Sequence, residues 1–127
     1  MISSSSSLGG GTKHMFMLGR NLNSDFNVFY AIPKNSHFEN YLDSNIHIAI
    51  SERKLSFIDT LKLFFFIKSK SIDIIHAHGK GAGLISRILI ILTWRPLIYT
   101  FHGIHLKCHS KFTKIIYIFF MNLYLEV

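Results

Sequence analysis

Short runs of β-favouring residues alternate along this chain with longer stretches of helical periodicity. Four such runs begin near residues 26, 46, 73 and 96, which leaves room for a crossover between neighbours. Alternation of this kind is typical of a mostly parallel sheet with right-handed connections. We therefore expect an α/β fold with a doubly wound, mostly parallel sheet. The four runs are FNVFYAI (Phe26 to Ile32), IHIAI (Ile46 to Ile50), DIIHAHG (Asp73 to Gly79) and PLIYTFHG (Pro96 to Gly103).

The stretches between the β-type runs carry helix signals. Met15, Leu18 and Leu22 recur at helical spacing near the start of the chain. Ser56 and Asp59 are spaced like a capping box, which indicates a helix that begins directly after Ser56. The helices expected after the first one cover residues 57–68, 83–93 and 111–126.

The beginning of the chain is a poor candidate for a central strand. Met1 and Ile2 are followed by five serines. Serine has a weak preference for strands and buries little apolar area. Either the first strand is short, or its amino-terminal half is missing.

Length and charge narrow the class of protein. The 127 residues fit a single domain, and a hydrophobic content of 49% indicates a globular chain. The net charge of +7 favours anionic partners such as phosphate groups, nucleic acid or an anionic membrane surface. Nucleic acid is not expected as a partner, because the basic residues are scattered and no recognition motif accompanies them. The single cysteine, Cys108, excludes an internal disulfide and suggests a reducing compartment.

The sequence predicts a cytoplasmic location, because the serine-rich start lacks the features of a secretory signal. Each apolar window is well short of the roughly 20 residues that cross a bilayer. Lys107, Lys111 and Lys114 precede a strongly apolar stretch, residues 115–125. This segment either docks on anionic lipid at the inner face of the cell membrane or forms a core helix with a solvated first turn.

Glycine and histidine gather where strands are expected to give way to helices. In an open parallel sheet the ligand lies beyond the carboxyl ends of the strands, and we call that edge of the sheet the rim. The opposite junctions carry ordinary turn residues. The rim residues are Gly9, Gly10 and Gly11 after the first strand, His78, Gly79, Gly81 and Gly83 after the fourth, and His102 and Gly103 after the fifth.

The turn GGGTKH allows the backbone to approach a ligand, and its free N–H groups can bind a phosphate. It matches neither the P-loop nor the dinucleotide fingerprint GxGxxG, because His14 stands where the last glycine would fall. A flexible turn without a ligand is the alternative.

The histidines differ in their expected roles. His76 and His78 point to one face of a strand like half a metal site, but no nearby acid or thiol completes it, so we expect no metal. A packed or hydrogen-bonded role suits His76. His102 ends an apolar strand, where its ring can hydrogen-bond a sugar hydroxyl, stabilise developing charge, or simply fix the loop. The remaining pair, His105 and His109, is expected on the solvated surface.

Three segments in this order resemble the amino-terminal half of family 4 glycosyltransferases, retaining enzymes of the two-domain GT-B fold. They are LGGGTKH, DIIHAHGKGAGLISRI and RPLIYTFHGIH. The resemblance implies a Rossmann-like acceptor-side domain over residues 1–127. It also implies sugar transfer from a nucleotide-sugar donor to a saccharide or lipid-linked acceptor in cell-surface polysaccharide synthesis, with no cofactor.

The same resemblance assigns roles to rim residues. Gly10 and Gly11 would approach the donor phosphates, and His102, followed by Gly103, would face the reaction centre as the catalytic residue. His14 and His78 are weaker substrate-binding candidates on the rim, as is Gly79.

One departure from the family pattern affects the expected activity. The chain ends at Val127, before the carboxyl-terminal domain in which this family binds most of the nucleotide sugar and carries its paired glutamates. We therefore expect a fragment that is inactive in isolation. A non-catalytic anion-binding or interaction domain that kept the fold is the alternative.

Overall fold

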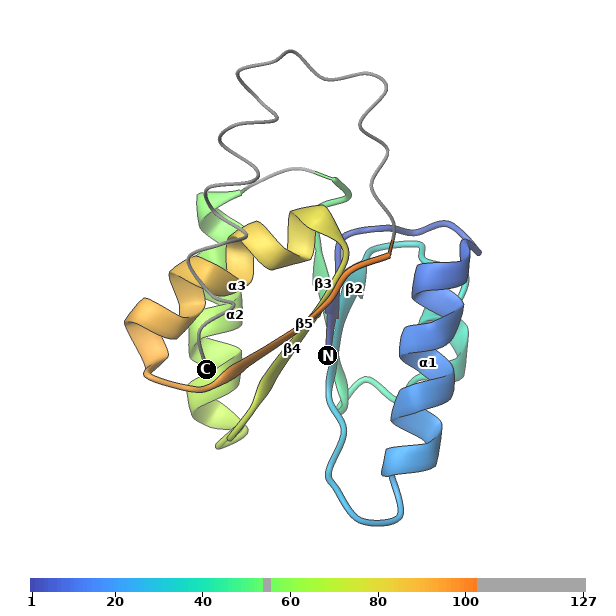
Figure 1. Cartoon of the computed structure of the whole chain (residues 1–127), viewed down its shortest axis with the longest axis horizontal. Coiled ribbons are helices and arrows are strands. Elements are labelled where there is room, and N and C mark those ends of the chain that lie inside the picture. Colours follow the sequence, from blue (N-terminus) through green and yellow to red (C-terminus); the bar gives the residue numbers. More distant parts are fainter. Residues whose placement is uncertain (54–55, 103–127) are drawn as a thin grey trace.

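The computed structural model describes residues 1–53 and 56–102, and in this part five parallel strands form one sheet (Figure 1). The strand order is β3-β2-β1-β4-β5. Helix α1 covers one face, and α2 and α3 cover the other (Figure 1). The predicted doubly wound α/β fold is confirmed. The strands are β1 (Ile2–Ser3), β2 (Tyr30–Pro33), β3 (His47–Ile50), β4 (Ile75–His78) and β5 (Leu97–Thr100), and the helices are α1 (Gly10–Leu22), α2 (Phe57–Ser69), α3 (Lys80–Thr93) and the short 3₁₀ helix η1 (Glu39–Tyr41).

Each face of the sheet has its own core, because side chains alternate along the strands. On the α1 side, Met15 and Phe16 pack against Tyr30 and Ile32. The ring of Phe16 stacks on Tyr30 with a centroid distance of 5.0 Å. The larger cluster lies under α2 and α3 and consists of Ile2, Ala31, Ile50, Leu63, Ile67, Ile75, Ala77, Ala82, Ile85 and Leu89.

The first strand is central in the sheet and only two residues long. Ile2 pairs with both Ala31 and Ala77, so this short element joins the two halves of the sheet. Ser3 and Ser4 are buried, and a Cβ atom added at Gly81 would collide with Ser4 Oγ. The missing side chain at Gly81 thus allows the start of α3 to pack closely on Ser4.

Strand β2 begins at Tyr30 instead of the expected Phe26. The amide groups of Asp25 and Phe26 both donate to the carbonyl of Leu22, so these residues still belong to the turn that ends α1. Phe26 is exposed to solvent. The aromatic residues at the start of this run therefore led to a predicted strand that begins too early.

Ser56 caps the start of α2, but the reciprocal bond of the expected capping box is replaced, because the Asp59 carboxylate bonds to Ser51 instead of Ser56. Ser56 Oγ accepts a hydrogen bond from the Asp59 amide at 3.3 Å. The buried Asp59 carboxylate in turn accepts from the Ser51 amide at 2.9 Å, which ties the helix start to the end of β3. Helix α3 begins at Lys80, earlier than the expected Gly83. Its first residue follows Gly79, whose φ of +81° lies in the left-handed region that favours glycine.

Several predictions concern residues outside the described part of the chain. They are the helix at 111–126, the proposed lipid contact near Lys107, Lys111 and Lys114, and the roles of Gly103, His105, Cys108 and His109. Among the residues that the structure describes, no helix combines the length and the apolar character needed to cross a membrane.

Candidate functional site

The strand order creates an opening at the rim. The chain runs outward from β1 to β2 and β3, then returns to place β4 on the other side of β1. The connections that leave β1 and β4 therefore lead to helices on opposite faces, α1 and α3 (Figure 1). Divergent connections of this kind leave a crevice at the carboxyl ends of the two strands, where open α/β sheets bind ligands.

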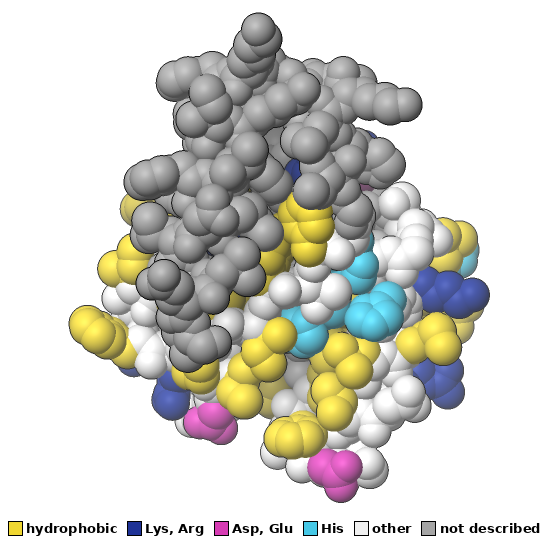
Figure 2. All heavy atoms as spheres, viewed as in Figure 1, with side chains coloured by type: hydrophobic (Ala, Val, Ile, Leu, Met, Phe, Trp, Pro, Cys, Tyr) yellow, Lys and Arg dark blue, Asp and Glu magenta, His cyan; other side chains and the backbone are white. Residues whose placement is uncertain are grey.

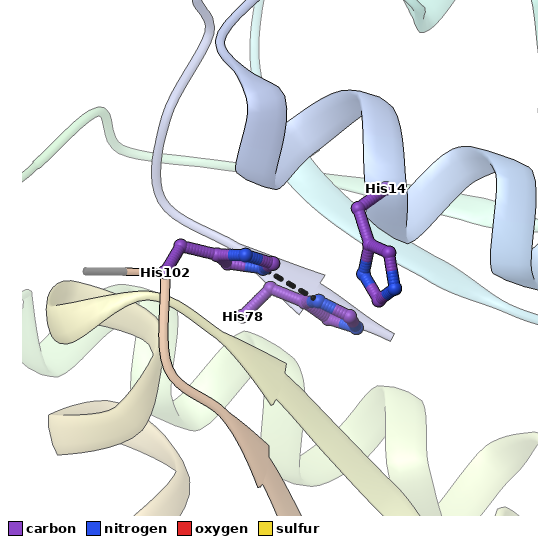
Figure 3. A group of neighbouring side chains, drawn as sticks. All are labelled: His14, His78 and His102. Atoms are coloured by element: carbon purple, nitrogen blue, oxygen red, sulfur yellow. Dashed lines mark hydrogen bonds between the residues drawn. The ribbon is translucent and has the colours of Figure 1, made fainter.

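Three histidine rings meet at this opening (Figure 3). His14 comes from α1, His78 is the last residue of β4, and His102 follows β5. One nitrogen from each ring lies within 4.8 Å of the other two. His78 Nδ1 and His102 Nε2 form a hydrogen bond at 3.1 Å, and we call these three residues the histidine cluster.

Strand register explains why these distant residues meet. Ile75 and Ala77 belong to the core under α2 and α3, so His76 and His78 point to the α1 face. His78 pairs with Thr100 on the neighbouring strand, and His102 is two positions further along. Helix α1 starts over the same face and contributes His14. As predicted, His78 and His102 lie together at the rim.

The histidine cluster is reachable from solvent on one side. His14 is exposed and His102 is half-buried, whereas His78 is only 3% exposed. Figure 2 shows histidine side chains gathered together on the surface of the molecule. A ligand can therefore contact the cluster without any movement of the sheet.

Burial favours the neutral form of two of these rings, His78 and His102. It lowers the pKa of His78 to about 3, and the nearby rings of His76 and His102 add to the effect by repelling a positive charge. Burial is also the main cause that lowers the pKa of His102, and the nearby His14 lowers it further. A neutral imidazole carries one N–H and one lone pair, so one ring of the His78–His102 hydrogen bond donates and the other accepts. Among the described residues, His78 Nε2 has no hydrogen-bond partner.

His76 has a structural role and does not join the histidine cluster. Its Nε2 atom shares a hydrogen bond of 2.7 Å with Thr100 Oγ1. Its ring stacks on His78 with a centroid distance of 4.1 Å. The hydrogen bond agrees with the role expected for His76. The stacking contact limits the movement of the His78 ring.

The segment GGGTKH, expected as a turn, is the N-cap and first turn of α1, and it lies beside the histidine cluster. A Cβ atom at Gly11 would lie 2.8 Å from ring carbons of His102. The same atom at Gly10, which is exposed, would meet nothing within 4 Å. Gly9, the N-cap of α1, has no side chain that could bond to the amide groups of the first turn. The backbone at Gly10 is thus open to a ligand.

The sequence model of Glycosyltransferase Family 4 matches residues 8–126. The chain belongs to glycosyltransferase family 4. Searches of curated proteins and of solved structures gave no match. The range that matches the family model includes the GGGTKH segment and all three residues of the histidine cluster.

The rim of this family 4 chain carries a second hollow that the sequence did not predict. It is lined by the basic residues Lys34, Arg53 and Lys62, together with Ser51, Glu52 and Asp59. The signal in the sequence was weak, because each of these cations stands alone after a strand or inside a helix.

The two acids of this basic hollow already have partners. Glu52 accepts from Ser6 Oγ at 2.7 Å and lies 3.6 Å from Arg53 Nε. Asp59 accepts from the Ser51 amide. Lys34 and Lys62 are exposed, so this hollow suits an anionic ligand in a family 4 domain.

Proposed function

We propose that this chain is the acceptor-side domain of a retaining glycosyltransferase. The complete enzyme would move a sugar from a nucleotide-sugar donor onto a saccharide or lipid-linked acceptor in cell-surface polysaccharide synthesis. The observation that carries this proposal is the contact between His102 and the first turn of α1, at the rim of a family 4 chain.

In this proposal the two sides of that contact have different tasks. The amide groups near Gly10 and Gly11 approach the donor phosphates, because a helix N-terminus favours negative charge. The neutral ring of His102 hydrogen-bonds the transferred sugar and orients it. His78 is a positioning residue, since its hydrogen bond holds the His102 ring. His14 and Gly79 are weaker substrate-binding candidates, and Gly103, which lies outside the described residues, keeps the role that the family resemblance implies.

The basic hollow is the proposed site for an anionic group on the acceptor. Lys34 follows β2 directly, and Arg53 follows β3, so both cations lie at the rim. The three cations of the hollow outnumber its two acids, so a phosphate or carboxylate of the acceptor would be attracted there. The acceptor would then extend along the rim toward His102.

The donor nucleotide is proposed to bind mainly to a second domain, outside these 127 residues. Transfer requires donor and acceptor to be held together in an oriented, water-poor site. The described residues provide one wall of such a site. We propose a cytoplasmic enzyme at the inner face of the membrane, because three lysines precede the apolar stretch at 115–125 and suit anionic lipid.

A transfer assay with a supplied second domain tests this proposal. The 127-residue chain is joined to the donor-binding domain of another family 4 enzyme and incubated with a panel of labelled nucleotide sugars and acceptors. We expect transfer by the joined protein, and none by either part alone. Turnover by the 127-residue chain alone would contradict the proposed division of labour.

The same assay distinguishes the proposed transferase from the alternative, a non-catalytic domain. If the joined protein binds the donor but transfers no more sugar than the donor-binding domain alone, the transferase proposal fails. The chain would then be a non-catalytic domain that kept the fold.

A further inference from the structure

We propose that His14, His78 and His102 form a binding site for a divalent transition-metal ion, with Zn²⁺ as the best match. The ion and the sugar would compete for the His102 ring, so the metal site is tested by binding measurements and not by sugar transfer. The proposal assigns a ligand to the histidine cluster as a whole, whereas the proposed transfer reaction uses the His102 ring.

The spacing of the ring nitrogens suits a metal centre. In a tetrahedral zinc site with Zn–N bonds of about 2.0–2.1 Å, two ligand nitrogens are about 3.3 Å apart. His78 Nδ1 and His102 Nε2 are 3.1 Å apart, close to this value. The three nitrogens of the cluster already lie within 4.8 Å of one another.

The remaining adjustment falls on the residue that can make it most easily. His78 is buried, and the His76 ring stacked against it limits its movement. His14 is exposed on α1 and lies at the edge of the cluster, with its ring centroid 5.5 Å from that of His102. A change of side-chain rotamer at His14 therefore closes the site without moving the sheet.

The protonation of the rings also suits an ion. Imidazole binds metal through a lone pair and must be neutral to do so. In the hydrogen bond between the two rings, one of the nitrogens, His78 Nδ1 or His102 Nε2, already accepts through a lone pair. When the ion enters, the proton shared by the two rings moves to the other nitrogen of its own ring. Both rings then stay neutral and both present a lone pair.

The chemistry of the three ligands selects the class of ion. Imidazole nitrogen suits Zn²⁺, Co²⁺, Ni²⁺ and Cu²⁺, whereas Mg²⁺ and Ca²⁺ prefer oxygen ligands. Among the described residues, the cluster contains three histidines and no carboxylate. Three protein ligands leave a fourth position for water or an exchangeable ligand. The exposed side of the cluster gives that ligand access.

The spacing of the histidines in the sequence did not predict this site. The pair His76 and His78 is two residues apart, but His76 bonds to Thr100 instead. The ligands that accompany His78 come from α1 and from the end of β5, far away along the chain.

Cobalt titration of the complete 127-residue chain tests the proposal. Co²⁺ is added at about pH 7.5 and followed by its visible d–d absorption, with calorimetry for affinity. We expect saturation at one Co²⁺ per cluster, displacement by Zn²⁺, and no effect of excess Mg²⁺ on the spectrum.

Matched variants assign the ion to the cluster. His14→Ala should weaken Co²⁺ and Zn²⁺ binding by at least about tenfold, since it removes one of three ligands. The control His37→Ala removes another exposed histidine, which lies outside the cluster, and should leave the affinity unchanged. Circular dichroism verifies that both variants fold. Absence of saturable binding in the unmodified chain, or equal affinity in the folded His14→Ala and His37→Ala variants, would overturn the proposal.

Discussion

Gly11 and His102 are in contact at the rim, so closely that a Cβ atom at Gly11 would lie 2.8 Å from Cγ and Cδ2 of the His102 ring. The first turn of α1 and the end of β5 therefore meet because residue 11 has no side chain. A Cβ atom at Gly10, the preceding residue, would meet nothing within 4 Å. These two neighbouring glycines provide a matched pair for testing how His102 is positioned.

Gly10→Ala and Gly11→Ala should have different effects on stability. Alanine is favoured over glycine in a helix by up to about 1 kcal/mol. We expect Gly10→Ala to keep some of this gain, because its methyl group meets nothing. Gly11→Ala should lose it, because the methyl group displaces the His102 ring. Urea unfolding of both variants measures the difference, and an equal gain would contradict the contact.

Stability should fall as the pH decreases below about 6.5, because of His78. Burial lowers the pKa of this ring from 6.5 to about 3 in the folded chain. Between these values the unfolded chain binds a proton at His78 and the folded chain does not. The contribution of neutral His78 is therefore complete above pH 6.5 and is lost progressively toward pH 3, with a slope of up to about 1.4 kcal/mol per pH unit.

Urea unfolding at several pH values between about 7 and 5 measures this slope. His78→Asn removes the titrating ring and should flatten the pH dependence. His76, whose pKa is lowered to about 4 by burial first and by nearby positive charge second, keeps part of the slope in that variant. The same slope in both proteins would show that His78 is not held neutral.

Thr100→Val should destabilise the chain by about 1 kcal/mol, because the partner of His76 is lost and its ring nitrogen stays half-buried. Thr100→Ser retains the hydroxyl group and serves as the control. The free energies of unfolding compare the two. If the valine variant is as stable as the serine variant, the His76–Thr100 hydrogen bond does not support the rim.

Lys62→Ala should raise the KM for an anionic acceptor by on the order of tenfold in the joined transferase, with little change in kcat. The reason is that Lys62 lines the basic hollow and would bind the acceptor before and during the reaction alike. Lys68→Ala, on the same helix near its end and outside the hollow, is the control. Steady-state kinetics with acceptor varied make the comparison. Equal KM values for the two variants would remove the hollow from the proposed acceptor site.

The fold was predictable because its local signals agree with one another. The alternation of strands and helices, together with the cap at Ser56, predicted all the elements that follow the short first strand in the described part except the 3₁₀ turn η1. The boundary error at Phe26 arose because aromatic residues favour strands, while the backbone there still closes the end of α1. Such a competition is decided by hydrogen bonds that a pattern of residue types does not contain.

The candidate site was predictable only in part. His78 and His102 end neighbouring strands, so their proximity follows from parallel pairing. The approach of His14 depends on how α1 lies across the sheet, and the tight contact at Gly11 depends on the same packing. Residues so far apart in the sequence have no spacing rule, which is why neither the three-ring arrangement nor the basic hollow could be derived beforehand.

The most direct test of the proposed transferase is the effect of His102→Ala in the joined enzyme. If the ring orients the donor sugar or stabilises charge chiefly in the transition state, kcat should fall on the order of 10²-fold, a cost of about 3 kcal/mol. The melting temperature, measured on the same preparation, should fall slightly, because the buried His78 ring loses the partner of its Nδ1 atom, at a cost of about 1 kcal/mol. His37→Ala is the control for both measurements. An unchanged kcat for the folded His102→Ala enzyme, with a lowered melting temperature, would contradict the account and make His102 a structural anchor of the loop.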